Sequence, residues 1–283
     1  MDHSAPPPAA RKAAAAVRMA AIQMVSGAEV GANLAAAGRL LAEAAERGAR
    51  LAVLPEFFPL MGLRETDKVA VRERAGSGPI QDFLAASARR LGLWIIGGSV
   101  PLAASAPDKV RNSCLVYDPE GALAARYDKI HLFGFDNGSE RYVEANTIEP
   151  GREAQVLESP FGRIGLSICY DLRFPELYRR MGAVDAIVIP SAFTATTGQA
   201  HWETLIRARA IENLTYVLAP AQGGVHASGR RTHGHSMIVD PWGEILACIP
   251  EGPGVALADI DPARVAAVRG SLPALEHRTL API

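Results

Sequence analysis

The chain alternates short apolar runs with longer stretches in which apolar residues recur every three or four positions. The first pattern is typical of buried β-strands, and the second is typical of helices that cover a sheet. Strands are predicted over residues 17–24, 49–54, 93–99, 112–117, 123–127, 164–168, 186–190, 215–219 and 255–260, with a further hairpin over residues 236–246. Helices are predicted over residues 30–47, 79–90, 175–181, 202–213 and 262–268.

This order of strands and helices, interrupted by hairpins, predicts an α/β protein with layers and a mixed sheet. Two turns have the sequence Asp-Pro-x-Gly, beginning at Asp118 and Asp240, and each joins two strands of a predicted hairpin. The repeated turn indicates two similar halves, but the pattern leaves open whether they form one large sheet or two packed sheets. Residues 133–151 are polar, and we expect a long loop there.

Composition narrows the class of protein. The 283 residues are 49% hydrophobic, enough for a large core, and the 29 basic and 30 acidic residues give no case for binding nucleic acid or an anionic membrane surface. No apolar run is long enough to span a membrane. Residues 1–16 contain a Pro triplet and no signal-peptide core, so we expect a disordered leader followed by one domain over residues 17–283.

The chain has three cysteines, which lie far apart and form no metal-binding spacing, so neither a disulfide framework nor a zinc site is predicted. A reducing, cytoplasmic location fits this usage. Cys114 and Cys248 lie within predicted hairpin strands, where a structural role is expected. Cys169 differs, because it follows an apolar strand and precedes a segment in which Pro175 begins a helix.

Three reactive side chains follow strand ends, where α/β proteins commonly place their sites: Glu56, Lys129 and Cys169. If they converge, the ammonium of Lys129 and the nearby helix N-terminus would favour a thiolate, and Glu56 could accept the thiol proton and return it to a leaving amine. Each also has a simpler interpretation: a surface carboxylate, a solvated amine and a small buried apolar residue. Spacing along the chain does not distinguish a convergent catalytic site from these simpler interpretations.

A Cys-His pair is the rival arrangement, with His131, His201 and His235 as candidates. His131 would lie on the same side of an extended segment as Lys129, although a structural hydrogen bond is the simpler role. His201 precedes a predicted helix and could form a helix-entry contact or a pocket wall. The chain has no GxSxG turn, no dinucleotide fingerprint and no P-loop.

Three segments together resemble the signature segments of the nitrilase superfamily of carbon–nitrogen hydrolases. They are Leu-Pro-Glu-Phe-Phe around Glu56, Tyr-Asp-Lys-Ile-His-Leu-Phe around Lys129, and Gly-Leu-Ser-Ile-Cys-Tyr-Asp-Leu-Arg-Phe-Pro-Glu around Cys169. The wider sequence is similar to the branch that contains omega-amidase and deaminated-glutathione amidase. The resemblance covers about residues 17–278 and implies a four-layer α-β-β-α sandwich with two mixed sheets. It also implies a homodimer or higher homo-oligomer and no metal or organic cofactor.

The resemblance also implies roles for individual residues. Cys169 matches the nucleophile, Glu56 the general base and Lys129 the lysine that stabilises the transition state. A second glutamate belongs after the lysine segment, where Glu144 is the better match and Glu140 is the alternative.

The expected reaction is hydrolysis of a small linear amide, such as an omega-monoamide of a dicarboxylate or keto acid or deaminated glutathione, to acid and ammonia through a thioester. Tyr170 would donate its backbone N–H, His201 would contact the substrate, and Arg173 would bind a substrate carboxylate, unless it pairs with Asp171 or Glu176. Alternatives are nitrile or N-carbamoyl amine hydrolysis, acyl transfer to an amine, and a non-catalytic binding protein.

Overall fold

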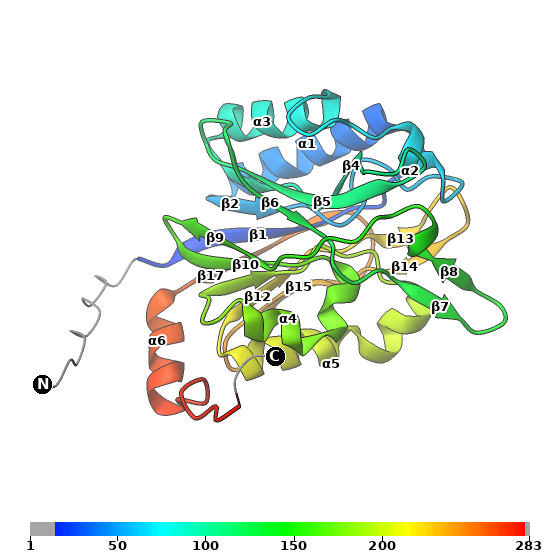
Figure 1. The fold of residues 1–283 in the computed structure, drawn as a ribbon. Helices are drawn as coiled ribbons and strands as arrows, with labels where there is room; N and C mark the ends of the chain where they lie inside the picture. Colours follow the sequence, from blue (N-terminus) through cyan, green and yellow to red (C-terminus); the bar gives the residue numbers. More distant parts are fainter. Residues whose placement is uncertain (1–14, 281–283) are drawn as a thin grey trace, which may run out of the picture.

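A computed structural model describes residues 15–280 as two β-sheets that pack face to face, with helices on both outer faces (Figure 1). This is the four-layer α-β-β-α sandwich expected from the resemblance, and it answers the question of one sheet or two. The expected disordered leader, apart from residues 15 and 16, lies outside the described residues. Within the described part of the chain, no helix is both long enough and apolar enough to cross a membrane.

The first sheet has seven strands, which are β1 (Val17–Gln23), β2 (Leu51–Val53), β3 (Trp94–Ile96), β4 (Val100–Ala103), β5 (Val110–Tyr117), β6 (Leu123–Asp128) and β17 (Gly254–Ile260). Strands β1, β2 and β3 are parallel. The strands that flank them are antiparallel to their neighbours, with β17 beside β1 and the β5–β6 hairpin beyond β3. The C-terminal strand therefore completes the sheet of the N-terminal half.

The second sheet repeats this arrangement with six strands, which are β9 (Gln155–Ser159), β10 (Gly162–Leu166), β11 (Ala186–Val188), β12 (Tyr216–Ala219), β15 (Ser236–Val239) and β16 (Ile245–Ile249). Again three parallel strands, β10 to β12, lie between antiparallel neighbours. The two predicted Asp-Pro-x-Gly hairpins are β5–β6 and β15–β16. The expectation of two similar halves agrees with this topology.

Helices α1 (Val30–Glu46) and α3 (Pro79–Leu91) cover the first sheet, and α4 (Pro175–Arg180) and α5 (Ala195–Asn213) cover the second (Figure 1). Helix α6 (Pro262–Ser271) lies at the side of the layers in the same view. The remaining elements are short, namely α2 (Asp67–Ala70), the 3₁₀ turns η1 (Glu144–Asn146) and η2 (Cys169–Arg173), and the two-stranded ribbons β7 (Gly134–Asp136) with β8 (Arg141–Val143) and β13 (Gly223–Val225) with β14 (Arg231–His233).

Strand β1 shows why the sheets form from continuous apolar runs. Met19 and Ala21 face the core between the sheets, whereas Ala20 and Ile22 face the helices. Both faces of the strand are therefore buried, so the strand needs no polar alternation. Full burial of each large apolar side chain contributes about 1.5–3 kcal/mol, and this is the main force that holds the layers together.

Several predicted boundaries differ from the structure, and three of the differences concern segments near the site. The strand predicted over residues 93–99 ends at Ile96, because the chain is kinked at Gly98 before it continues along β5, in the same direction, as β4, a strand that was not predicted. Helix α5 begins at Ala195 and not near residue 202, since the Thr194 hydroxyl accepts a hydrogen bond from the Thr197 N–H and caps it. The stretch 133–151 is not one loop, because it contains the β7–β8 ribbon and η1. Strands β9, β13 and β14 were not predicted.

Gly98 gives a stability prediction that bears on the site. Its φ is +53°, and an added Cβ would lie 2.0 Å from the carbonyl oxygen of Pro55. Gly92, at the end of α3, has a similar φ of +62° with open space around it. We expect Gly92→Ala to lower the free energy of unfolding by about 1–2 kcal/mol for its backbone conformation alone. Gly98→Ala should cost at least about 1 kcal/mol more, because the Pro55 backbone must also move. Urea unfolding of both variants measures the two losses of stability. Equal losses would contradict the predicted steric cost at Gly98.

Candidate active site

A buried lysine between two carboxylates forms the centre of the site. Lys129 directly follows β6, and its Nζ lies 2.8 Å from Glu56 Oε1, 2.8 Å from Glu144 Oε2 and 3.1 Å from Glu144 Oε1. The Lys129 side chain is fully buried, and those of Glu56 and Glu144 are 1% and 10% exposed. Glu56 follows β2 and Glu144 begins η1, so three separate segments supply the cluster.

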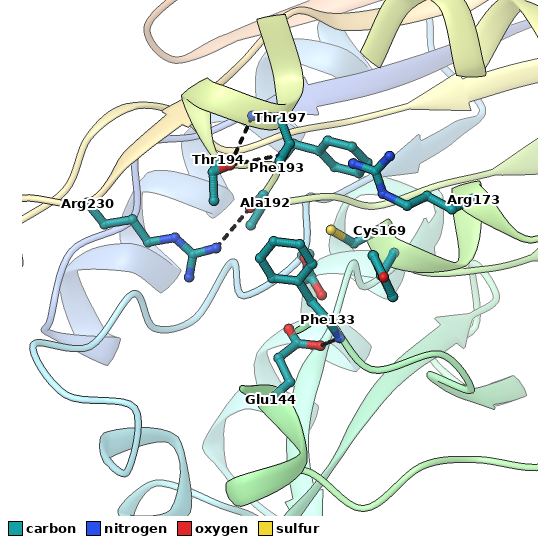
Figure 2. A pocket seen from close by; sticks show the side chains of 11 residues that line it. Phe133, Glu144, Cys169, Arg173, Ala192, Phe193, Thr194, Thr197 and Arg230 are labelled. Carbon is teal, nitrogen blue, oxygen red and sulfur yellow. Dashed lines mark hydrogen bonds between the residues drawn. The ribbon is translucent and has the colours of Figure 1, made fainter. Parts of the chain in front are cut away.

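Cys169 lines the same narrow cavity as Glu56 and Glu144, a space of about 270 Å³ (Figure 2). It is the first residue of η2, three positions after β10 ends at Leu166, and its φ of +50° is unusual for a residue with a side chain. The Asp171 carboxylate stabilises this turn by accepting a hydrogen bond from the Ile168 N–H at 2.8 Å. The Cys169 N–H donates to the Pro190 carbonyl at 2.9 Å. The Tyr170 N–H has no acceptor within residues 15–280.

Glu56 uses its two carboxylate oxygens differently. Oε1 accepts hydrogen bonds from Lys129 and, at 2.9 Å, from Asn112 Nδ2. Oε2 is buried and has no hydrogen-bond partner among the described residues. A buried carboxylate oxygen without a donor is costly, and such an oxygen is a ready acceptor for a proton. Glu56 therefore presents one fixed oxygen and one reactive oxygen.

Burial dominates the electrostatics of the cluster. It raises the pKa of Glu56, an effect that Lys129 opposes and that Glu144 reinforces. Although burial lowers the pKa of Lys129, the charges of Glu144 and Glu56 hold that pKa well above its ordinary value. Burial and the charge of Glu56 raise the pKa of the Cys169 thiol well above its ordinary value, despite Lys129. Lys129 favours the thiolate, as expected, but desolvation and the charge of Glu56 outweigh its effect on the pKa of Cys169.

The structure brings Glu144, and not Glu140, to Lys129. Glu144 also accepts a hydrogen bond from the Phe133 N–H at 2.7 Å, which ties the cluster to the cavity wall. Glu140 lies on the exposed turn of the β7–β8 ribbon, where the nearest donor to its carboxylate is the Thr196 hydroxyl at 3.3 Å.

Arg173 and Tyr170 line the cavity, whereas His201 does not. The Arg173 guanidinium lies 3.3 Å from His201 Nδ1 and 5.3 Å from the Phe193 ring centre. Within residues 15–280 Arg173 makes no ion pair, so the alternative of a pair with Asp171 or Glu176 is wrong. His201 is exposed and contacts Arg173, which corrects its expected place in the pocket wall.

The histidine alternative fails on geometry. His131 Nδ1 lies 2.8 Å from Asp171 Oδ1, and the ring stacks on Phe174 with 3.7 Å between ring centres. Tyr127 donates to the other Asp171 oxygen at 2.7 Å, so His131 belongs to the network that stabilises the turn after Cys169. His235 contacts the carbonyl of His233. In the described part of the chain, no group of three or more His, Cys, Asp or Glu side chains could hold a metal ion.

Several residues of the site were not found from the sequence. They are Asn112, which donates to Glu56, and the cavity residues Phe133, Ala192, Phe193, Thr194, Thr197 and Arg230. Most of them lie in loops or in the unexpected first turns of α5, where the sequence has no periodic pattern. Arg230 lies in a Gly-, Ser- and Arg-rich turn between β13 and β14 that resembles an ordinary surface loop. Only its basic side chain could have drawn attention to it.

The chain matches a known protein family over most of its length. The family model described as carbon-nitrogen hydrolase matches residues 18–270, and the chain belongs to this family. The family and the fold expected from the resemblance are thereby confirmed.

Among individual relatives, the chain is 44% identical over 266 residues to a deaminated glutathione amidase of Synechocystis, covering 92% of this chain and 97% of that protein. It is 38% identical over 251 residues to omega-amidase NIT2 of Xenopus tropicalis, covering 87% of this chain and 89% of that protein. The crystal structure of the Caenorhabditis elegans NitFhit protein matches with a TM-score of 0.87 and 36% identity, covering 95% of this chain and 66% of that longer chain.

The raised pKa of Glu56 predicts a distinctive dependence of stability on pH. A folded-state pKa above the unfolded value contributes stability that is fully present below the unfolded pKa and is lost as pH rises through the folded pKa. We expect wild type to lose stability relative to Glu56→Gln as pH is raised from acidic to neutral, because the variant has no charge to bury.

Glu149→Gln is the matched control, since hydrogen bonds from Ser105 and the charge of Arg111 lower the pKa of Glu149. Wild type should gain stability relative to this variant over the same rise in pH. Urea unfolding at several pH values measures both differences. Differences of the same sign for the two variants would contradict the electrostatic description of Glu56.

Proposed function

We propose that this protein is a cysteine-dependent amidase that hydrolyses a small linear amide through a thioester on Cys169. The observation that carries the proposal is the cavity in which the Cys169 thiol adjoins Glu56, whose Oε2 has no hydrogen-bond partner within residues 15–280. Nucleophilic catalysis by cysteine requires a base near the sulfur and a cation or donor near the carbonyl oxygen. Glu56 and Tyr170, which both line the cavity, support these two roles.

The first half of the reaction forms the thioester. Glu56 accepts the proton of the thiol as the sulfur bonds to the carbonyl carbon, and the oxyanion is stabilised by the Lys129 ammonium and the Tyr170 N–H. Loss of one such donor typically raises a barrier by about 3–4 kcal/mol. The tetrahedral intermediate collapses with cleavage of the C–N bond, and Glu56 gives its proton to the departing nitrogen. A primary amide releases ammonia at this step.

The second half of the reaction hydrolyses the thioester and regenerates the free enzyme. Glu56, now ionised, accepts a proton from a water molecule whose oxygen bonds to the thioester carbonyl carbon. The second intermediate collapses with cleavage of the C–S bond, and the proton on Glu56 returns to the sulfur as the acid leaves. A general base works best when its pKa is near the working pH, and the raised pKa of Glu56 moves it in that direction.

Glu144 is a positioning residue in this proposal. It accepts two contacts from Lys129 at 2.8 and 3.1 Å and therefore fixes the ammonium beside Glu56, which lines the cavity. Its negative charge also supports the charged form of Lys129, which burial alone would disfavour. Lys129 consequently remains a cation that can stabilise an oxyanion, and it is not available as a proton acceptor.

The substrate class follows from Arg173. Its guanidinium reaches the cavity without an ion pair in the described part of the chain, and guanidinium groups bind carboxylates through paired hydrogen bonds. We propose that the acyl part of the substrate ends in a carboxylate, as in an omega-monoamide of a dicarboxylate or keto acid. The names of the relatives, deaminated glutathione amidase and omega-amidase, support this class.

Association of two chains and a cytoplasmic location also belong to the proposal. Pairing is supported by two exposed apolar side chains, Ile211 on α5 (45% exposed) and Trp242 in the β15–β16 turn (57% exposed). The cytoplasmic location is supported by the three cysteines, none of which forms a disulfide.

Replacement of the nucleophile tests the reaction. We expect Cys169→Ala to lower kcat for hydrolysis of succinamate, a primary monoamide of a dicarboxylate, by at least about a thousandfold, because only binding and oxyanion contacts remain. Ammonia release measures the rate, and mass spectrometry of rapidly quenched wild type should detect one acyl group on Cys169.

Cys248→Ala is the control, since this exposed cysteine lies on β16 outside the cavity, and it should retain full activity. Hydrolysis that persists in Cys169→Ala would contradict the covalent mechanism.

A further inference from the structure

Asn112 on β5 is a buried residue of the site to which the reaction above gives no role. It is 2% exposed, its Nδ2 donates to Glu56 Oε1 at 2.9 Å, and its carbonyl oxygen accepts the Lys129 N–H at 3.0 Å. Asn112 does not line the catalytic cavity, so its contacts are with these two residues and not with a bound substrate. One residue of β5 therefore holds Glu56 through its side chain and Lys129 through its backbone.

Other residues hold the backbone around Glu56. Gln222, which lies beyond β12 of the second sheet, is fully buried, and its Nε2 donates to the Glu56 carbonyl at 3.1 Å. The Phe57 N–H donates to the Ser99 hydroxyl at 2.9 Å. These contacts fix where Glu56 lies. They do not fix the direction of its carboxylate, because the last torsion of a glutamate side chain has broad minima.

Glu144 shows that the same lysine can bind a carboxylate differently. Both oxygens of Glu144 contact Lys129 Nζ, at 3.1 Å from Oε1 and 2.8 Å from Oε2. Glu56 contacts Lys129 through Oε1 alone, and the same oxygen accepts the hydrogen bond from Asn112. An ammonium is a compact donor that does not distinguish the two oxygens of a carboxylate. The second donor, Asn112, therefore concentrates the hydrogen bonds on Oε1 and leaves Oε2 without a partner in the described part of the chain.

The hydrogen bond from Asn112 also affects the charge of Glu56. Burial raises the pKa of Glu56, Lys129 opposes this effect, and Glu144 reinforces it. Cys169 is a further titratable group that faces the carboxylate. A donor to a carboxylate favours its ionised form, so the neutral amide of Asn112 supports ionised Glu56 without a second ammonium.

We propose that Asn112 is a positioning residue, which turns the Glu56 carboxylate so that Oε2 alone serves the sulfur and which keeps that carboxylate ionised at working pH. The inference rests on the proposed role of Glu56 as the base in amide hydrolysis. It adds the residue that makes one oxygen of this base reactive and the other fixed.

The pH profile of kcat/KM for succinamate tests the assignment. The acid limb of that profile reports ionisation of the base in the free enzyme, which in this mechanism is Glu56. Asn112→Leu keeps a similar volume and removes the donor. We expect its acid limb to move to higher pH by about one to two units, the effect of one hydrogen bond to a charged group.

The same variant should separate kcat from KM. We expect kcat to fall by about ten- to a hundredfold, because a carboxylate that can turn is often misplaced for proton transfer. KM should change little, because Asn112 does not line the cavity. Asn112→Ala removes the same donor without an added apolar contact and should give the same displacement, so the test does not depend on the folding of Asn112→Leu.

Gln222→Met is the matched control, because Gln222 is also a buried amide that donates to Glu56, but to its backbone carbonyl. This variant should lower kcat without displacing the acid limb, since the carboxylate keeps both of its donors. Equal displacement in Gln222→Met and the Asn112 variants, or an unchanged acid limb in the Asn112 variants, would overturn the proposal while leaving amide hydrolysis intact.

Alkylation of Cys169 gives a readout that needs no amide turnover. The thiol has to lose its proton to react with iodoacetamide, and Glu56 is the proposed acceptor. In a Cys248→Ala background, which removes the exposed cysteine, mass spectrometry measures the alkylation rate at each pH. Asn112→Leu should move this profile to higher pH by about one to two units. That displacement in a protein that hydrolyses no amide would support the positioning role and reject the amidase, whereas an undisplaced profile would reject the positioning role.

Discussion

One buried cation, the ammonium of Lys129, determines the electrostatics of the candidate site. Lys129 has no exposed surface, and it is stable as an ammonium only because Glu56 and Glu144 lie within hydrogen-bonding distance. Burial of a charge without partners costs several kcal/mol, so the three side chains have to be considered as a unit. The two sheets make this unit possible by fixing strand ends from both halves of the chain around one cavity.

The same three charged side chains determine where the proton of the Cys169 thiol resides. Two carboxylates and one ammonium leave the cluster with a net negative charge, and burial strengthens its effect on the neighbouring thiol. The pKa values of the Cys169 thiol and of the neighbouring Glu56 carboxyl are therefore both raised. In the proposed reaction the proton moves only when a carbonyl group arrives, because the developing oxyanion provides the charge that Lys129 can stabilise.

The fold was largely predictable because its strands are short apolar runs that are buried on both faces, as in β1. The segments that carry Glu56, Lys129 and Cys169 were also recognisable, since each follows such a run. The convergence of these three residues could not be predicted from their spacing, because spacing along a chain does not define the order of strands in a sheet. The resemblance favoured Glu144, but the polar β7–β8 ribbon has no pattern that excluded Glu140. Arg230 gave no signal beyond its charge, because an ordered turn and a solvated turn can have the same composition.

The central claim is that the buried Glu56–Lys129–Glu144 cluster keeps Cys169 protonated until substrate binds. The most direct test is the ultraviolet absorbance of thiolate as a function of pH, taken as the difference between wild type and Cys169→Ser. The claim predicts no thiolate signal from Cys169 near neutral pH in the absence of substrate. A thiolate that forms below neutral pH would contradict it.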